Sequence, residues 1–323
     1  MIIKPRTVPL ELLQLQALDE RLPEMHIAKK LVCDELGRRM AGYKGEVNLN
    51  YPLSFLSPDD FFILHHVRLF DGTHYFQIDT LIITMKFILI VETKNMSGTL
   101  YFDTEFNQLI RTNEKGAEGF SDPLLQVKRH KIQLRKWLTI LKLSHLPIET
   151  LVVSSNSRTI LQSSSDTVHN KVIHSGQLPF QIELLQEKYK GEHFQKEEAI
   201  ELANEIAKNH RPLKIDLLKK FGIKPQDLIK GVKCPHCECL PCKRAYGKWM
   251  CGNCGGESRD AHVAALRDYA LLIGNEVTNG DVREFLKVDS FSSTKYLLNS
   301  LKLPFKGDRR WRVYSLEGLI TGD

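Results

Sequence analysis

Two short acidic motifs hold the residue types best suited to catalysis in this chain of 323 residues. They are Gln77-Ile78-Asp79 and, thirteen residues further on, Glu92-Thr93-Lys94. Two neighbouring carboxylates repel each other, and burying them together is costly unless a cation lies between them. Mg²⁺ or Mn²⁺ suits that position because it binds carboxylate and phosphate oxygens. The motifs therefore predict a metal site that polarises a scissile phosphate, with Lys94 orienting or deprotonating the attacking water.

A β-hairpin is the element that must bring these motifs together. Tyr75–Thr84 and Phe87–Lys94 are rich in β-forming residues, and Met85-Lys86 is the turn that joins them. In this register Asp79 lies opposite Glu92, and alternation along the strands places both motifs on one face. Both strands are otherwise strongly apolar, which predicts that the acidic residues are at least partly covered. The alternative is that both are ordinary solvated strand residues.

Two helices are expected to supply further polar groups. Glu46 lies on a predicted helix, residues 44–55, which glycines at 42 and 45 separate from an earlier helix over residues 25–40; it is a further candidate carboxylate ligand. A long amphipathic helix is predicted for Asp122–Leu143, with Gln126 and His130 one turn apart on the same side. Gln126 is expected near the metal or the phosphate backbone, whereas the pattern around His130 favours a polar helix edge.

Several segments around these residues share a family pattern. They are Gly45-Glu46, Gln77–Ile83, Ile90–Asn95 with Gly98, and Asp122–Gln126 with His130. Over about residues 42–155 the chain resembles the NERD, or nuclease-related, domain, which is placed in the PD-(D/E)xK nuclease superfamily. The resemblance implies an α/β, restriction-endonuclease-like mixed sheet flanked by helices. It carries the family's acidic and lysine positions to Glu46, Asp79, Glu92 and Lys94, and its helical polar pair to Gln126 and His130. Met85-Lys86 replaces a glycine of the family pattern, which affects the turn and not the chemistry.

A second metal site is predicted from the cysteines, six of the seven lying between residues 234 and 254. Cys234-Pro-His-Cys237 and Cys251-Gly-Asn-Cys254 form two knuckles whose four thiolates close on a structural Zn²⁺, as in a zinc ribbon. Cys239-Leu-Pro-Cys242 is an alternative first knuckle and His236 an alternative ligand. Trp249 is expected either on a basic, aromatic face of the ribbon or in its interior.

The last part of the chain resembles a winged helix-turn-helix. Thr278–Val288 is a capped helix, a short turn follows, and Ser292–Leu301 is a second helix before a turn and strand at Lys306–Tyr314. The expected nucleic-acid contacts are Lys243, Arg244 and Lys248 of the ribbon, Ser293 and Lys295 of the second helix, and Arg309, Arg310 and Arg312 of the wing.

Charge is distributed in a way that fits a polyanion-binding appendage. The net charge is +6, and from residue 208 onward 21 Lys and Arg residues stand against 13 Asp and Glu, while the first 207 residues hold 24 and 26. Because no apolar run reaches 18 residues, no membrane span is expected, and the lack of an export pattern in the first residues predicts a cytoplasmic protein.

The sequence thus predicts five segments: a helical extension (1–41), the nuclease-related domain (42–190), a helical linker (191–230), the zinc ribbon (231–258) and the helix-turn-helix module (259–323). The expected function is Mg²⁺- or Mn²⁺-dependent hydrolysis of DNA. Two alternatives stay open, a non-catalytic DNA-binding protein built on a nuclease fold and an RNA-directed nuclease. Cutting both strands of a duplex favours a homodimer.

Overall fold

The chain forms two compact units in a computed structural model that describes residues 1–193 and 195–321, with the side chains of Arg310 and Thr321 excepted. Unit 1 comprises Met1–Val8 and Arg39–Leu213, and unit 2 comprises Pro9–Arg38 and Lys214–Asp323. This division differs from the predicted segments. The first eight residues join the nuclease-related part, and the helix after them joins the C-terminal part.

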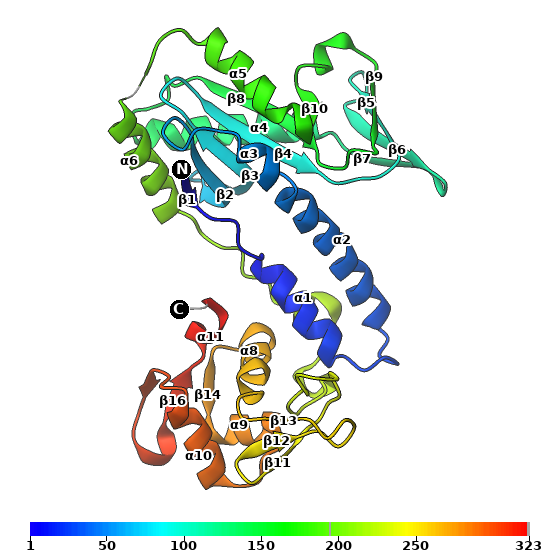
Figure 1. Ribbon diagram of the computed structural model, residues 1–323, viewed down its shortest axis with the longest axis vertical. Coiled ribbons are helices and arrows are strands. Elements are labelled where there is room, and N and C mark those ends of the chain that lie inside the picture. Colours follow the sequence, from blue (N-terminus) through cyan, green and yellow to red (C-terminus); the bar gives the residue numbers. More distant parts are fainter. Residues whose placement is uncertain (194, 322–323) are drawn as a thin grey trace. The chain divides into compact units, whose positions relative to one another are not determined.

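Unit 1 is built on a six-stranded mixed sheet, in the order β1-β2-β3-β4-β8-β10 (Figure 1). Strands β2, β3 and β4 pair antiparallel, whereas β1 pairs parallel with β2, β8 with β4 and β10 with β8. The prediction of a mixed sheet flanked by helices is confirmed. The strands are β1 (Ile2–Lys4), β2 (Phe62–Phe70), β3 (Tyr75–Ile83), β4 (Ile88–Lys94), β8 (Ile148–Ser154) and β10 (Val172–His174).

The β3–β4 hairpin has the predicted register, with its pairs running from Ile83 opposite Ile88 to Thr80 opposite Val91. Met85-Lys86 is a weak turn sequence, and Thr84 compensates for it. The Thr84 hydroxyl oxygen accepts hydrogen bonds from the backbone N–H groups of residues 86 and 87, at 3.1 and 2.9 Å. A side chain that satisfies backbone donors in this way fixes a tight turn without glycine.

Helices cover both faces of this sheet, which explains why β4 is apolar at almost every position. Ile88 and Ile90 pack with α4 (Pro123–Ile140) and α6 (Lys196–Lys208) on one face. Leu89 and Val91 pack with α3 (Asn50–Leu53) and α5 (Leu178–Lys188) on the other. The predicted helix over residues 122–143 is confirmed as α4. Asp122 caps its first turn by accepting a hydrogen bond from the Leu124 N–H at 2.8 Å, and proline follows the cap.

A smaller, four-stranded sheet in unit 1 has the order β7-β6-β5-β9. Residues of β5 and β6 are rich in β-forming types, whereas β7, with the sequence GAEGFS, contains two glycines and an acidic residue, which disfavour strands. The strands are β5 (Thr99–Asp103), β6 (Gln108–Asn113), β7 (Gly116–Ser121) and β9 (Ile160–Ser163).

Helix α2 (Lys29–Val47) runs unbroken through both glycines that were predicted to end it, so that prediction is wrong. The reason is packing. A Cβ on Gly45 would lie 2.3 Å from the Cβ of Asn95, and the Asn95 amide donates to the carbonyl of Ala41 at 2.7 Å. The missing side chain lets the end of α2 approach the end of β4 closely, which places the next residue, Glu46, at the sheet.

Unit 2 combines helices with two small sheets, β11-β12-β13 and β14-β16-β15. Its helices are α1 (Leu10–Arg21), α7 (Leu217–Phe221), α8 (His262–Leu272), α9 (Asn279–Leu286), α10 (Phe291–Ser300) and α11 (Glu317–Thr321), and α2 begins in it. The strands are β11 (Lys243–Ala245), β12 (Lys248–Met250), β13 (Glu257–Ser258), β14 (Glu276–Thr278), β15 (Phe305–Lys306) and β16 (Val313–Ser315). Both predicted C-terminal helices are present, and α9 starts at a capping box formed by Thr278 and Asp281.

The cysteine-containing segment and the C-terminal helices of unit 2 share one hydrophobic core. Cys234 and Trp249 from the cysteine-containing segment belong to the same cluster of buried residues as Phe285 and Leu297 from α9 and α10. Arg21, which is fully buried, ties α1 to this core through an ion pair with Asp268 at 2.8 Å. Among the described residues, no helix is both long and apolar enough to cross a membrane.

Candidate active site and metal centre

A break in strand alternation shapes the sheet at Asp79. The β2–β3 ladder has pairs on both sides of His66 and Asp79 but skips these two residues. His66 has a φ of +50°, a left-handed conformation that is unusual for a non-glycine residue. Ile78 and Leu81, three residues apart, both point to the same core. Simple period-two alternation, on which the prediction of a shared face rested, therefore does not hold at this point of β3.

The Asp79 carboxylate reaches the neighbouring strand instead. The β3–β4 ladder ends at Thr80 opposite Val91, so Asp79 and Glu92 lie just beyond its last pair. Oδ2 of Asp79 accepts a hydrogen bond from the backbone N–H of Thr93 at 2.9 Å. This bond holds the Asp79 side chain against β4, next to the predicted Glu-x-Lys motif.

Glu92, Lys94 and Gln126 form one hydrogen-bonded group. The ammonium of Lys94 donates to Oε1 of Glu92 at 2.6 Å and to Oε1 of Gln126 at 3.2 Å. Gln126 lies in the first turns of α4, which the Asp122 cap fixes beside the end of β4. Glu92 is 3 % exposed, and its second oxygen, Oε2, is buried without a hydrogen-bond partner in the described part of the chain. A buried carboxylate oxygen without a partner is costly, so Oε2 is an open ligand position.

Glu46 comes from the last turn of α2 and is held by two donors. Its Oε2 accepts a hydrogen bond from Nη1 of Arg6 at 2.7 Å and contacts Nε2 of His66. Both donors fall on the same oxygen, which leaves Oε1 for another partner. Arg6 follows β1, and the Arg6 side chain is only 3 % exposed.

The carboxylates act on one another electrostatically. Burial, followed by the charges of Glu92 and Glu46, raises the pKa of Asp79 well above its ordinary value. Burial also raises the pKa of Glu92, and the Lys94 ammonium opposes that rise. Two neighbouring carboxyl groups whose pKa values are raised by burial are candidates for a functional site.

These residues fit a hard divalent cation, although they do not form a closed cage. Among the described residues, the four cysteines discussed below are the one group of three or more metal-ligand side chains gathered within 4.8 Å. Glu46, Asp79 and Glu92 are more widely spaced. Mg²⁺ is usually bound by one or two carboxylates together with water and substrate phosphate, so an open set of oxygens suits it. Asp79 and the free oxygen of Glu92 are the residues that would hold it.

The structure thus brings five sequence-predicted residues to one place: Glu46, Asp79, Glu92, Lys94 and Gln126. It adds Arg6, His65 and His66, which sequence reasoning missed. A signal existed for the two histidines, because they interrupt an otherwise apolar strand. No signal near Arg6 marked it, since the segment that carries it precedes the family pattern by more than thirty residues.

His130 is buried, so the expectation of a polar helix edge is wrong. It lies at 9 % exposure with its ring 6.2 Å from that of Phe76. Burial, together with the charges of Arg129 and Lys94, lowers the pKa of His130 to about 4. The imidazole is therefore neutral at physiological pH and packs against Phe76.

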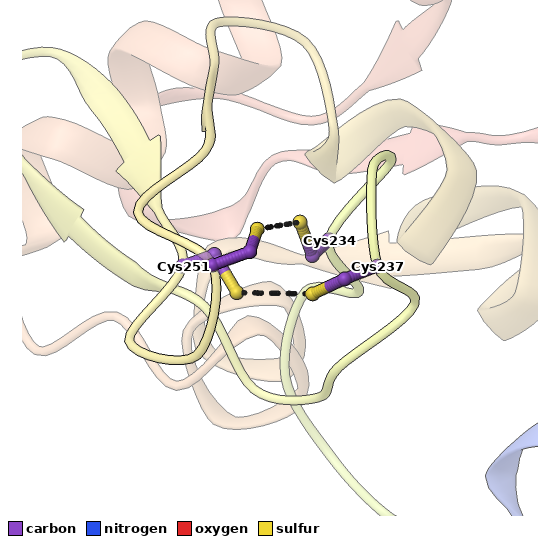
Figure 2. A group of neighbouring side chains, drawn as sticks. Cys234, Cys237 and Cys251 are labelled. Atoms are coloured by element: carbon purple, nitrogen blue, oxygen red, sulfur yellow. Dashed lines mark hydrogen bonds between the residues drawn. The ribbon is translucent and has the colours of Figure 1, made fainter.

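Unit 2 contains the second candidate metal centre. The Sγ atoms of Cys234, Cys237, Cys251 and Cys254 all lie within 4.8 Å of one another. Figure 2 shows the first three turning their sulfurs inward; the sulfurs of Cys237 and Cys251 are 3.5 Å apart. Backbone N–H groups of the knuckles point at sulfur, and those of Cys254 and Asn253 lower the pKa of Cys251 to about 6. Four converging thiols, with backbone N–H groups aimed at their sulfurs, fit a tetrahedral zinc site of the zinc-ribbon type.

The alternative ligands are not part of this group. Among the described residues, the sulfurs that lie within 4.8 Å of one another are those of Cys234, Cys237, Cys251 and Cys254, and Cys242 does not belong to this group. Cys239 is exposed, and His236 lies 3.4 Å from the carbonyl oxygen of Glu257. The sulfurs that converge with those of Cys251 and Cys254 are those of Cys234 and Cys237, the residues predicted as the first knuckle. Trp249 is 1 % exposed and its ring stacks on that of His262 in α8, so it lies neither on an open basic face nor in the ribbon alone but in the core that the ribbon shares with the C-terminal helices.

The residues predicted to contact nucleic acid differ in how exposed their side chains are. Lys243, Lys295 and Arg309 are exposed. Lys248 is paired with Glu257 at 2.5 Å across the β12–β13 sheet. The remaining predicted residues are partly buried or undescribed: Arg244 lies over the Trp249 ring, Arg312 lies over the Phe305 ring, Ser293 belongs to the first turn of α10, and the Arg310 side chain is outside the described residues.

Comparison with protein-family models matches residues 41–155 to NERD, the nuclease-related domain. The chain therefore carries a nuclease-related domain, and the resemblance inferred from its motifs is confirmed. The matched segment includes the end of α2, the β3–β4 hairpin and α4, and so it contains Glu46, Asp79, Glu92, Lys94 and Gln126. Neither the curated proteins nor the solved structures gave a match to this chain.

Proposed function

We propose that unit 1 hydrolyses phosphodiester bonds in DNA with Mg²⁺ or Mn²⁺. The observation that carries this proposal is the buried Oε2 of Glu92, which has no partner among the described residues. It lies beside Asp79, and the other oxygen of Glu92 is bound to Lys94. Paired carboxylates with a lysine, inside a nuclease-related segment, are the residues that metal-assisted phosphodiester hydrolysis requires.

Each residue has a distinct role in this proposal. A bound divalent ion supplies Lewis acidity toward the phosphate and acidifies a water. Asp79, fixed by the Thr93 N–H, and Glu92 hold the ion. Lys94, held by Glu92 and Gln126, orients the attacking water and neutralises negative charge that develops on the phosphate. Because His130 is neutral, Lys94 is the cation that α4 and β4 keep at the reacting centre.

Unit 2 is proposed to bind the DNA. In this proposal zinc has a structural role, α9 and α10 form a helix-turn-helix, and the β15–β16 segment forms its wing. The exposed Lys243, Lys295 and Arg309 are the residues we expect to contact phosphate, whereas Lys248 contributes less because Glu257 neutralises it. A helix fits the major groove of B-DNA, while the major groove of duplex RNA is too narrow for it, which favours DNA over RNA.

The test is a cleavage assay on single-stranded DNA, duplex DNA and RNA, with Mg²⁺, with Mn²⁺ and without added metal. The proposal predicts metal-dependent cutting of DNA that is lost in Asp79→Asn. Cutting of RNA alone would assign the chain to the RNA-directed nucleases. If wild type and Asp79→Asn both bind DNA and neither cuts it under any of these conditions, the result contradicts catalysis and favours a non-catalytic DNA-binding protein.

A further inference from the structure

The N-terminal segment runs along β2 to the candidate active site. Ile2 pairs with Ile63 and Lys4 with Leu64, in parallel register. The ammonium of Lys4 donates to the carbonyl oxygen of His65 at 2.9 Å. The segment is therefore fixed residue by residue, and its direction brings Arg6 to the point where β2 and β3 leave their regular ladder.

Every nitrogen of the Arg6 guanidinium has an acceptor there. Nη1 donates to Glu46 at 2.7 Å, and Nη2 lies 3.2 Å from the Thr80 hydroxyl and 2.9 Å from Nδ1 of His65. Nε lies 3.4 Å from Oδ1 of Asn50. Because arginine only donates, Nδ1 of His65 must be the unprotonated nitrogen, and His65 is neutral. Arg6 therefore ties together β2, β3 and the end of α2 by directional bonds.

Glu46 is the one carboxylate in this set. Its Oε2 takes the bonds from both Arg6 and His66, so the carboxylate cannot rotate without breaking a buried, charge-assisted bond. With Oε2 engaged, Oε1 is the oxygen that can serve an ion. Partners that orient a metal ligand in this way contribute to metal affinity although they never touch the metal.

We propose that Arg6 is a positioning residue of the nuclease centre, which orients Glu46 as a third carboxylate for the metal held by Asp79 and Glu92. This inference rests on the proposed function for the presence of the metal. It extends the active site to a residue outside the family match at 41–155.

The test is a double-mutant cycle on Mn²⁺ affinity, measured by calorimetry on the full chain without nucleic acid. Arg6→Met, which keeps the length of the side chain and removes its donors, should weaken Mn²⁺ binding by about tenfold. In the Glu46→Gln background the same substitution should change the affinity by less than about twofold, because its target is already lost. Arg6→Lys, which keeps the charge and one donor group, should recover most of the affinity.

Lys4→Met is the matched control, because Lys4 is a cation of the same segment that bonds a backbone carbonyl and not Glu46. It should leave Mn²⁺ affinity unchanged. Circular dichroism and thermal unfolding check that each variant is folded, and if Arg6→Met is not, Arg6→Gln takes its place in the cycle. Unchanged Mn²⁺ affinity in folded Arg6→Met, or in the Arg6→Gln that replaces it, would overturn the inference, as would an equal loss in the Glu46→Gln background.

The inference and the proposed function fail separately. If Mn²⁺ affinity depends on Arg6 and Glu46 as predicted but wild type cuts no nucleic acid, the nuclease proposal fails and the positioning role stands. If wild type cuts DNA and Arg6→Met binds Mn²⁺ as tightly as wild type, the positioning role alone is refuted. A wild-type chain that binds no Mn²⁺ overturns both.

Discussion

At the scale of single residues, the Asp79 carboxylate accepts one backbone hydrogen bond, while burial and the charges of Glu92 and Glu46 raise its pKa. A charged group with so little compensation destabilises the metal-free fold. The same lack of compensation favours a bound cation. Function and stability therefore make opposite demands on this residue, as is common at active sites.

Asp79→Asn should stabilise the metal-free protein. The amide keeps an oxygen for the Thr93 N–H and removes the repulsion, so we expect a gain of about 1 kcal/mol, or roughly 2–4 °C in the unfolding temperature of a unit of this size. Thermal unfolding without added divalent metal measures it. Added Mn²⁺ should stabilise wild type and not the variant, and a less stable metal-free variant would contradict the account.

The stability difference between Asp79→Asn and wild type should depend on pH. Since the folded pKa of Asp79 is raised, the folded state binds more protons than the unfolded state between the unfolded pKa, about 3.9, and the folded one. Stability of wild type therefore falls as pH rises through this window. The advantage of the variant should be largest above the folded pKa and shrink as pH is lowered through it. Denaturant unfolding from about pH 8 to about pH 5 measures this, and an advantage that grows on acidification would refute it.

At the scale of residues, the sequence predicted Asp79, Glu92 and Lys94 because charged groups interrupt apolar strands there. The two histidines of β2 also interrupt an apolar strand, but the Arg6–Glu46 contact and the left-handed backbone of His66 were not predictable from such a pattern. Arg6 meets Glu46 across forty residues of chain, and His66 depends on a positive φ that local propensity disfavours. Both belong to the tertiary arrangement and not to a pattern along the chain.

At the scale of elements, the hairpin and α4 bring the site together, and the end of α2 completes it. The hairpin register followed from strand pattern and turn position. The continuity of α2 did not, because glycine has low helix propensity and nothing in the sequence shows that Gly45 packs against Asn95. Tertiary packing overrides the low helix propensity of glycine at this position.

Gly45→Ala and Gly42→Ala form a matched pair on α2. A Cβ at position 45 would meet Asn95 at 2.3 Å and Ser155 at 2.7 Å, whereas position 42 has open space. We expect Gly45→Ala to destabilise the protein by about 1–3 kcal/mol and to weaken Mn²⁺ binding by displacing Glu46. Gly42→Ala should stabilise by about 0.5–1 kcal/mol and leave Mn²⁺ binding unchanged. Denaturant unfolding and calorimetry compare them, and equal effects at both positions would show that the contact with Asn95 does not matter.

At the scale of the whole molecule, the chain forms two units, and the predicted N-terminal extension is divided between them: unit 1 contains both of its ends and unit 2 contains its middle, Pro9–Arg38. Residues 1–8 complete the nuclease-related unit, and α1 packs in the unit that holds the cysteines. Sequence patterns identified the helices but not the elements that they pack against. An amphipathic pattern shows that one face of a helix is buried, and it does not show which element covers that face.

Zinc removal should loosen the C-terminal helices together with the knuckles. Cys234 and Trp249 share one core with Phe285 and Leu297, so losing the metal disturbs that core as a whole. Hydrogen exchange before and after chelation should show lost protection in α8, α9 and α10 and unchanged protection in β2, β3 and β4. Loss confined to the four knuckle cysteines and their neighbours would contradict a shared core.

The most direct test of the nuclease centre compares DNA cleavage and Mn²⁺ affinity in wild type and Lys94→Gln, with the exposed Lys142→Gln as control. In the proposed mechanism Lys94, whose ammonium bonds to Glu92 and Gln126, acts on water and phosphate and does not bind the ion. The account predicts Mn²⁺ affinity within a few-fold of wild type and a loss of cleavage of about 100-fold or more. Cleavage by Lys94→Gln at the rate of wild type, with DNA and metal bound normally, would contradict it.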